Sequence, residues 1–193
     1  GVVLDGDFKV AQYGQWDGYP SGVGADIVTF CKDVDYETFK DKLRSVRFCT
    51  DEDRKEIQER WNSIGAGEGG WGTMEQAREF NSEPKFYALS RDVSAGVLNM
   101  IMNDQVEFLS DDRDFPKDSL SCEWAYVIDL DRHMLEVYEG FQKTTPKKGR
   151  WAGNEGFSDG YMACTLIAEY RLDELPTVDE FVLQTDRDDD VEE

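Results

Sequence analysis

The feature that most constrains the fold of this chain is an alternating stretch from Cys122 to Leu130, followed by a second from Met134 to Glu139. Every second position of the first stretch is Cys, Trp, Tyr, Ile or Leu, which is the period of a β-strand with one buried face. Asp131-Arg132-His133 separates the two stretches as a turn. We therefore predict a long antiparallel hairpin at the centre of a sheet, with a half-polar second face and with His133 exposed in the turn.

Further strand signals lie at the two ends of the chain. Residues 1–4 and 8–13 flank Asp5-Gly6-Asp7, a tight-turn signal, and predict an N-terminal hairpin. Residues 161–170 are apolar at successive positions, which indicates an internal strand. Between these ends, apolar residues recur at helical spacing in several segments, one of which is predicted over residues 36–47 and another over residues 92–102.

This order of elements predicts the α+β class. We expect a mainly antiparallel sheet that joins the N-terminal hairpin to the C-terminal strands, with the helices inserted between them and packed on one face. At 193 residues the chain has the size of one ordinary domain. We predict a single domain over residues 1–185 and a disordered acidic tail over residues 186–193, which hold six acidic residues and one arginine. Because the chain opens at Gly1 without Met, we also expect that an upstream segment is missing.

The charge is the most unusual global property: 21 basic and 42 acidic residues give a net charge of −21. Direct nucleic-acid binding is disfavoured because phosphate contacts need clustered Lys and Arg, and anionic membranes are disfavoured for the same reason. No run of about 18 apolar residues indicates a transmembrane helix. The acidity fits solubility in a cytoplasm, a surface that engages a basic partner, or adaptation to high salt. We expect a cytoplasmic protein without membrane association, and the oligomeric state stays open.

The sequence offers little material for metal or nucleophilic catalysis. A single histidine makes a His-based metal cage or a Ser-His-Asp triad hard to build. We therefore expect no metal and no cofactor, and whether the chain is an enzyme stays open. The four cysteines are widely spaced and lie in apolar contexts, so we expect buried, reduced thiols at Cys31, Cys49, Cys122 and Cys164.

The Gln12–Pro20 loop, between the N-terminal hairpin and the first helix, is the candidate ligand-contact surface. Its aromatic rings can stack on a planar molecule, while its amides and carboxylate can read the polar edge of that molecule. Alternatively, Trp and Tyr beside Gly and Pro can plug the end of a sheet with their polar tips hydrogen-bonded. The candidate contacts are Tyr13, Gln15, Trp16, Asp17 and Tyr19.

A second candidate segment is the polar stretch 142–160, which contains the one cationic cluster of this acidic sequence. It is either a solvated loop or a flap whose charges meet an anionic ligand or the protein's own acidic face. In the ligand interpretation, Lys147, Lys148 and Arg150 close over the phosphates of a nucleotide-like molecule.

Two other motifs lack the context that their chemistry requires. The glycine-rich stretch 65–72 follows a helix, and no Gly-Lys-Ser/Thr closes it, so we interpret it as a connection anchored by Trp71 rather than as a phosphate loop. Glu123 and Glu136 on neighbouring predicted strands form a carboxylate pair or lie separately on the surface, and we favour the surface interpretation.

Three stretches resemble a family of uncharacterised proteins from bacteriophages and bacteria, with relatives in some fungi. They are DGDFKVAQYGQWDGYPSGVG, CEWAYVIDLDRHMLEVYEGF and GYMACTLIAEYRLDELPTVDEF, and together they span both ends of the chain. Members open with a short segment ahead of the first strand that this sequence lacks. The resemblance implies a single, phage-encoded cytoplasmic domain, and it transfers no catalytic residue because the family has no established activity.

Two functional hypotheses follow. The first is an acidic binding protein that acts on a basic host protein, motivated by the net charge and by the lack of a catalytic constellation. The alternative is a nucleotide-like small-ligand binding protein or an enzyme, in which the Gln12–Pro20 loop and the cationic cluster bind a small anionic ligand.

Overall fold

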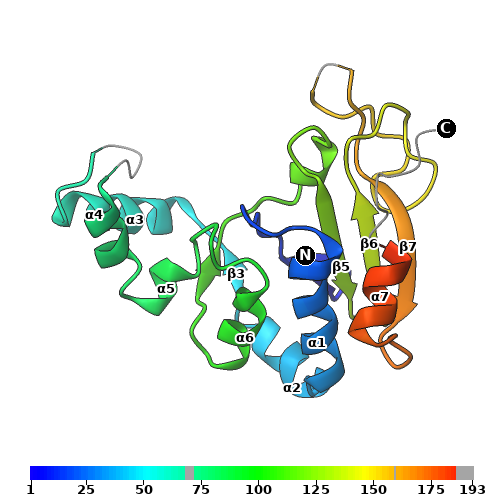
Figure 1. The fold of residues 1–193 in the computed structure, drawn as a ribbon. Helices are drawn as coiled ribbons and strands as arrows, with labels where there is room; N and C mark the ends of the chain where they lie inside the picture. Colours follow the sequence, from blue (N-terminus) through cyan, green and yellow to red (C-terminus); the bar gives the residue numbers. More distant parts are fainter. Residues whose placement is uncertain (68–71, 159, 186–193) are drawn as a thin grey trace.

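The structure is a computed structural model that describes residues 1–67, 72–158 and 160–185 (Figure 1). These residues form an α+β protein, as predicted, with helices beside a mixed and mostly antiparallel five-stranded sheet. The predicted acidic tail and Trp71, the predicted anchor of the glycine-rich stretch, lie outside the described residues.

The sheet joins both ends of the chain, as predicted. Neighbouring strands run antiparallel except for β1 and β5, which pair in parallel with Val2 opposite Ile128. The predicted hairpin is confirmed, and β5, its first strand, lies at the centre of the sheet. In spatial order the strands are β2 (Asp7–Val10), β1 (Val2–Leu4), β5 (Trp124–Asp129), β6 (Met134–Glu139) and β7 (Thr165–Arg171).

The turns of the two hairpins lie together. Asp5 and Gly6 connect β1 to β2 with φ values of 55° and 78°, the left-handed conformation that a two-residue hairpin turn requires. The Asp131 carboxylate in the β5–β6 turn accepts hydrogen bonds from the backbone N–H groups of Asp5 and Gly6 at 3.0 and 2.8 Å. The expectation of an exposed His133 was wrong: its ring is half-buried and packs edge-on against Tyr36, with 5.3 Å between centroids.

The prediction that residues 161–170 form an internal strand was also wrong, because β7 is the last strand of the described sheet. Its apolar character has another cause: both of its faces are covered. Leu166 packs against the cluster on one face of the sheet, and Ile167 packs against the main core on the other. A strand covered on both faces is apolar at successive positions whether or not it has a neighbour on each side.

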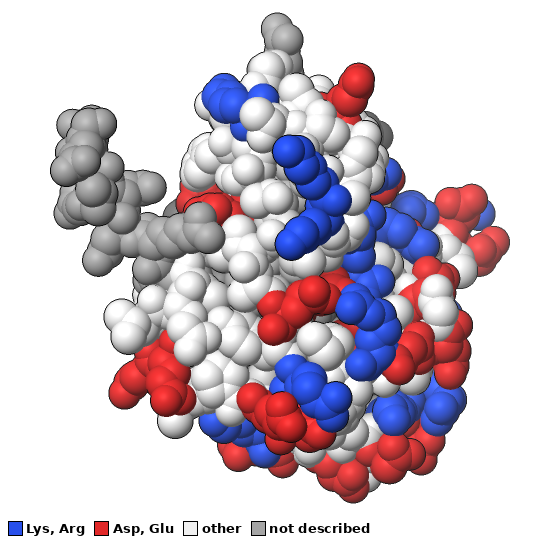
Figure 2. Space-filling view, turned by 90° about the vertical axis from the view of Figure 1, so that its right-hand side faces the viewer, with Lys and Arg blue, Asp and Glu red and all other residues white. Residues whose placement is uncertain are grey.

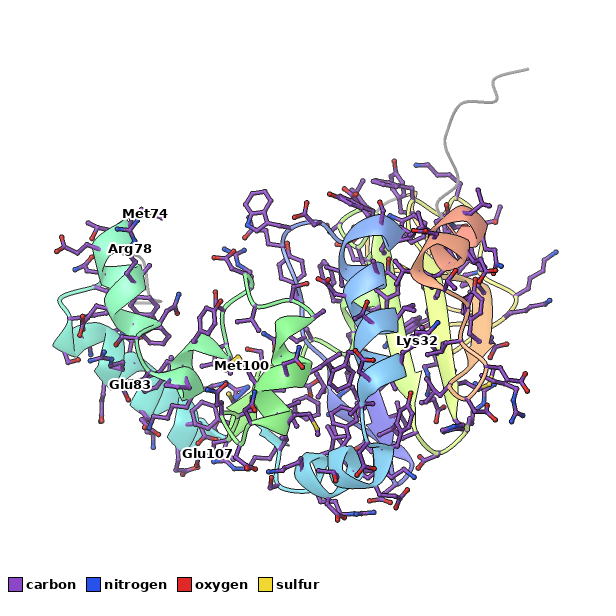
Figure 3. All side chains as sticks on the ribbon, turned by 60° about the horizontal axis from the view of Figure 1, so that its bottom comes forward. Lys32, Met74, Arg78, Glu83, Met100 and Glu107 are labelled. Carbon is purple, nitrogen blue, oxygen red and sulfur yellow. The ribbon has the colours of Figure 1, made fainter. Side chains whose placement is uncertain are left out.

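Helices cover one face of the sheet, as predicted (Figure 1). The main core between them and the strands includes Phe39, Leu98, Leu135 and Phe181. Helix α1 is tied to the loop before α7 by Lys32, whose Nζ donates to the carbonyl of Pro176 at 2.6 Å; Figure 3 labels Lys32. The helices are α1 (Ala25–Asp33), α2 (Tyr36–Leu43), α6 (Gly96–Met102) and α7 (Val178–Thr185).

Two of these helices are shorter than predicted. Helix α2 ends at Leu43, and the following Arg47–Phe48 forms strand β3, which pairs in parallel with β4 (Phe108–Leu109). Helix α6 begins at Gly96 because the residues ahead of it form turns, with Ser94 at a φ of 48°.

An arm of three helices extends away from the sheet (Figure 1). Its buried side chains form a small cluster of their own: Trp61 stacks on Phe80 with 3.9 Å between ring centroids, and Phe80 contacts Phe86 at 5.0 Å. Figure 3 shows Met74 and Arg78 at the end of the arm far from the sheet. The arm consists of α3 (Asp51–Ser63), α4 (Met74–Phe80) and α5 (Pro84–Tyr87).

The opposite face of the sheet is covered by residues 140–158 and 160–164, called here the flap. Flap residues Trp151, Ala163 and Cys164 pack with Val127 and Tyr138 into a second buried cluster. The predicted half-polar face is therefore buried at Val127 and Asp129, whereas Glu123 at its start is exposed. Three of the four cysteines are buried, Cys49 is half-buried, and all four are free thiols.

This second face holds two buried carboxylates. Asp129 and Glu136 are 2% and 1% exposed. The surface interpretation of Glu136 was therefore wrong, and it does not pair with Glu123, which is exposed. Arg150 of the flap bonds to Asp129 and donates from Nε to Glu136 at 2.7 Å. The Tyr138 hydroxyl donates to Glu136 at 2.8 Å, and Arg132 donates to it at 2.6 Å.

We predict that Arg150→Ala destabilises the fold strongly, because it leaves Asp129 and Glu136 buried without their shared cation. The free energy of unfolding should fall by about 3–5 kcal/mol in urea denaturation. Lys148→Ala is the matched control, since Lys148 is exposed on the same flap and should change stability by less than about 0.5 kcal/mol. Equal effects of the two substitutions would contradict this assignment.

Candidate ligand-binding site

A cavity of about 130 Å³ lies beneath the Gln12–Pro20 loop. Strands β1, β2 and β5, the turn ahead of α6, the segment 112–116 and Trp151 of the flap contribute to its walls. Drug-sized ligands occupy pockets of roughly 300–1,000 Å³, whereas an apolar cavity of about 150 Å³ holds one benzene molecule. The cavity therefore has the size of a single aromatic ring.

The loop over the cavity is held in place from two sides. On one side, the Gln15 N–H donates to the carbonyl of Arg91 at 3.1 Å, and the Trp16 indole N–H donates to Asp92 at 3.1 Å. On the other, the Tyr126 hydroxyl of β5 donates to the carbonyl of Gly18 at 2.9 Å. These bonds fix the loop against both the sheet and the turn ahead of α6.

Gln12 leaves one buried polar atom without a partner. Its amide nitrogen donates to the carbonyls of Ala88 at 2.8 Å and Ser90 at 3.2 Å. The reverse orientation would set the amide oxygen against two carbonyl oxygens, so the hydrogen bonds fix the orientation. Gln12 lines the cavity, and its Oε1 is buried with no hydrogen-bond partner among the described residues. Such an acceptor costs about 1–3 kcal/mol until a donor reaches it.

Asp112 supplies the one carboxylate among the lining residues. Burial raises the pKa of its carboxyl group, the backbone N–H of Tyr13 that bonds to it at 3.0 Å lowers that pKa, and the charge of Asp111 raises it. No ion pair among the described residues includes Asp112, whereas the neighbouring Asp111 is paired with Arg113 at 2.8 Å.

Aromatic side chains form much of the remaining wall. The Tyr13 ring lies 4.5 Å from the Phe115 ring, and Trp151 is held edge-on against Tyr138 with 4.4 Å between centroids. Phe8 and Trp124 also line the cavity. A planar ring would therefore meet aromatic faces and edges.

The structure brings few of the residues expected to bind a ligand into this cavity. Tyr13 lines it, whereas Gln15, Trp16, Asp17 and Tyr19 are exposed outside its walls. Trp16 is 62% exposed and Tyr19 is 45% exposed. The alternative interpretation of this loop expected the polar tips of its Trp and Tyr side chains to be hydrogen-bonded. Two side chains agree with that part: the Tyr19 hydroxyl donates to Asp17 at 2.8 Å, and the Trp16 indole N–H is also hydrogen-bonded.

The three flap cations predicted to contact a ligand also lie outside the cavity walls. Lys147 and Lys148 are exposed, and Arg150 bonds to the protein's own carboxylates. Sequence reasoning missed the lining residues Asp112, Phe115 and Trp124 as site residues. They come from separate segments, and no local motif marks them as members of one site.

Among the described residues, no group of three or more His, Cys, Asp or Glu side chains is placed to hold a metal ion. The helices described here include none that combines the length and apolar character needed to cross a membrane. Comparisons with protein-family models, with curated proteins and with solved structures find no match.

We predict that Asp112→Asn changes how stability depends on pH. Because the pKa of Asp112 is raised in the folded state, its contribution to stability is full below the unfolded-state pKa and is lost as pH rises through the folded-state pKa. Asparagine keeps an acceptor for the Tyr13 N–H and does not titrate. The free energy of unfolding of the variant, relative to wild type, should rise between about pH 4 and pH 7 in urea denaturation. A constant difference across this range would contradict the assignment.

Proposed function

We propose that this chain is a binding protein for a small, ring-sized organic molecule, which occupies the cavity beneath the Gln12–Pro20 loop. The observation that carries the proposal is the buried Oε1 of Gln12, an acceptor without a partner in the wall of a cavity that can hold one ring. Buried polar groups in folded proteins almost always have a partner, so the exception calls for a donor from outside the chain.

The same geometry favours a smaller ligand than a nucleotide. The cavity volume suits one ring, and the flap cations Lys147, Lys148 and Arg150 do not line it. Binding is favoured over catalysis because Asp112 is the one carboxylate of the lining residues and the single histidine lies in the β5–β6 turn.

A basic host protein remains a second prediction, which the surface charge supports. Figure 2 shows that most acidic side chains of one face lie on its lower part, with basic side chains among them, whereas the upper part of that face is mainly uncharged. A basic partner would meet the lower part. The phage origin implied by the sequence resemblance likewise stays a prediction.

We predict that filling the cavity abolishes ligand binding. In a thermal-shift screen of single-ring fragments, at least one fragment should raise the unfolding temperature of the wild type, because a ligand of the native state stabilises it. Ala95→Leu adds volume at a lining position and should remove that shift. Ala152→Leu is the matched control on the exposed flap surface and should keep it. A screen without any shift, or a shift that survives Ala95→Leu unchanged, would count against the proposal.

A further inference from the structure

We infer that the cavity selects a ring that carries N–H donors and a positive charge, such as an aminopyridinium, bound by Gln12 and Asp112. This inference rests on the proposed function and names the chemical class of its ligand. It follows from which polar groups of the cavity are still available after the protein's own hydrogen bonds are counted.

Three donor groups of the lining residues are engaged within the protein. The Gln12 amide nitrogen is bonded to two carbonyls, and the Tyr126 hydroxyl donates to Gly18. The Arg113 guanidinium donates from Nε to both carboxylate oxygens of Asp111, at 2.8 and 3.0 Å, and from Nη1 to Asp7 at 3.4 Å.

Two acceptors of the lining residues keep unused hydrogen-bonding capacity. Gln12 keeps Oε1, and Asp112 uses Oδ2 for a single hydrogen bond, from the Tyr13 N–H. A carboxylate can accept up to about four hydrogen bonds, so Asp112 retains most of its capacity. A ligand that brings N–H donors can therefore satisfy the acceptors of both Gln12 and Asp112.

The charge of the lining residues also favours a cationic ligand. Asp112 lines the cavity, and the ion pairs of the described residues leave it without a cation. Asp111, next to it in sequence, adds negative charge that is already paired with Arg113. A cationic ring would supply the missing partner through charge-assisted hydrogen bonds, and the surrounding aromatic faces also favour a cation. An anionic ring would be repelled by Asp112.

The lysines of the flap do not add positive charge to the walls of the cavity. Lys147 and Lys148 are exposed and outside the cavity walls, and the guanidinium of Arg150 is held by Asp129 and Glu136. The flap cations expected to bind an anionic ligand therefore do not line this cavity, and the lining cation Arg113 is already paired with Asp111 and Asp7.

Calorimetric titration of the full chain at pH 7 tests the inference with three single-ring probes: 4-aminopyridinium, toluene and benzoate. We expect 4-aminopyridinium to bind about tenfold or more tightly than toluene, and benzoate to bind more weakly than both. Asp112→Asn should weaken 4-aminopyridinium binding by about tenfold and leave toluene unchanged. Asp114→Asn removes the same charge outside the cavity walls and should leave both affinities unchanged.

The outcomes separate the ligand class from the binding function. Toluene binding as tightly as 4-aminopyridinium, or benzoate binding tightest, would overturn the inferred ligand class while the cavity remains a ligand site. If none of the three probes binds, the proposed function fails as well. Because the wild-type ranking alone decides between these results, the test does not depend on whether the Asp112→Asn variant folds.

Discussion

Burying both faces of the β5–β6 hairpin forces two carboxylates, Asp129 and Glu136, out of water, and the guanidinium of Arg150 makes that burial tolerable. A single planar cation with several N–H donors can serve two acceptor groups at once, which a lysine ammonium does with poorer geometry. Arg150 belongs to the flap, so the same contact that neutralises the sheet also brings Trp151 against Tyr138. The ion pairs that neutralise the buried carboxylates of the hairpin therefore also hold the flap against its second face.

The cavity is a consequence of how the ends of the chain meet. The parallel pairing of β1 with β5 sets the N-terminal hairpin beside the central strand, and the Gln12–Pro20 loop then has to cross from that hairpin to α1. The loop is bonded to the segment 88–92 on one side and to Tyr126 on the other, so it bridges over the sheet instead of collapsing onto it. Under that bridge lie the amide oxygen of Gln12 and the carboxylate of Asp112.

The parts of the fold that could be predicted are those encoded locally. Alternation from Cys122 to Leu130 predicts the central hairpin, and apolar residues at helical spacing predict the start of α2, where Asp35 caps the helix by accepting from the Glu37 N–H. The position of β7 could not be predicted, because burial on both faces gives a strand the same apolar character at the edge as in the interior. The burial of Glu136 was missed for a related reason: Arg150, the cation that it shares with Asp129, lies 14 positions later in the chain.

The candidate site was less predictable than the fold. The composition of the Gln12–Pro20 loop indicates where a ligand could bind, yet Trp16, its largest aromatic residue, is exposed outside the cavity. Asp112 carries no local signal, because its role depends on a segment about 100 residues away. Tertiary contacts of this kind are set by strand order, which the periodicity of a single sequence does not contain.

The small cluster of Trp61, Phe80 and Phe86 has a consequence for local unfolding of the molecule. These rings stack within the arm, and the main core takes its buried side chains from other parts of the chain. Amide protons of α3 and α4 are therefore protected by few apolar contacts compared with those of β5 and β6. We therefore expect the arm to behave as a separate cooperative unit, whose amide hydrogens exchange through local opening while the sheet stays intact.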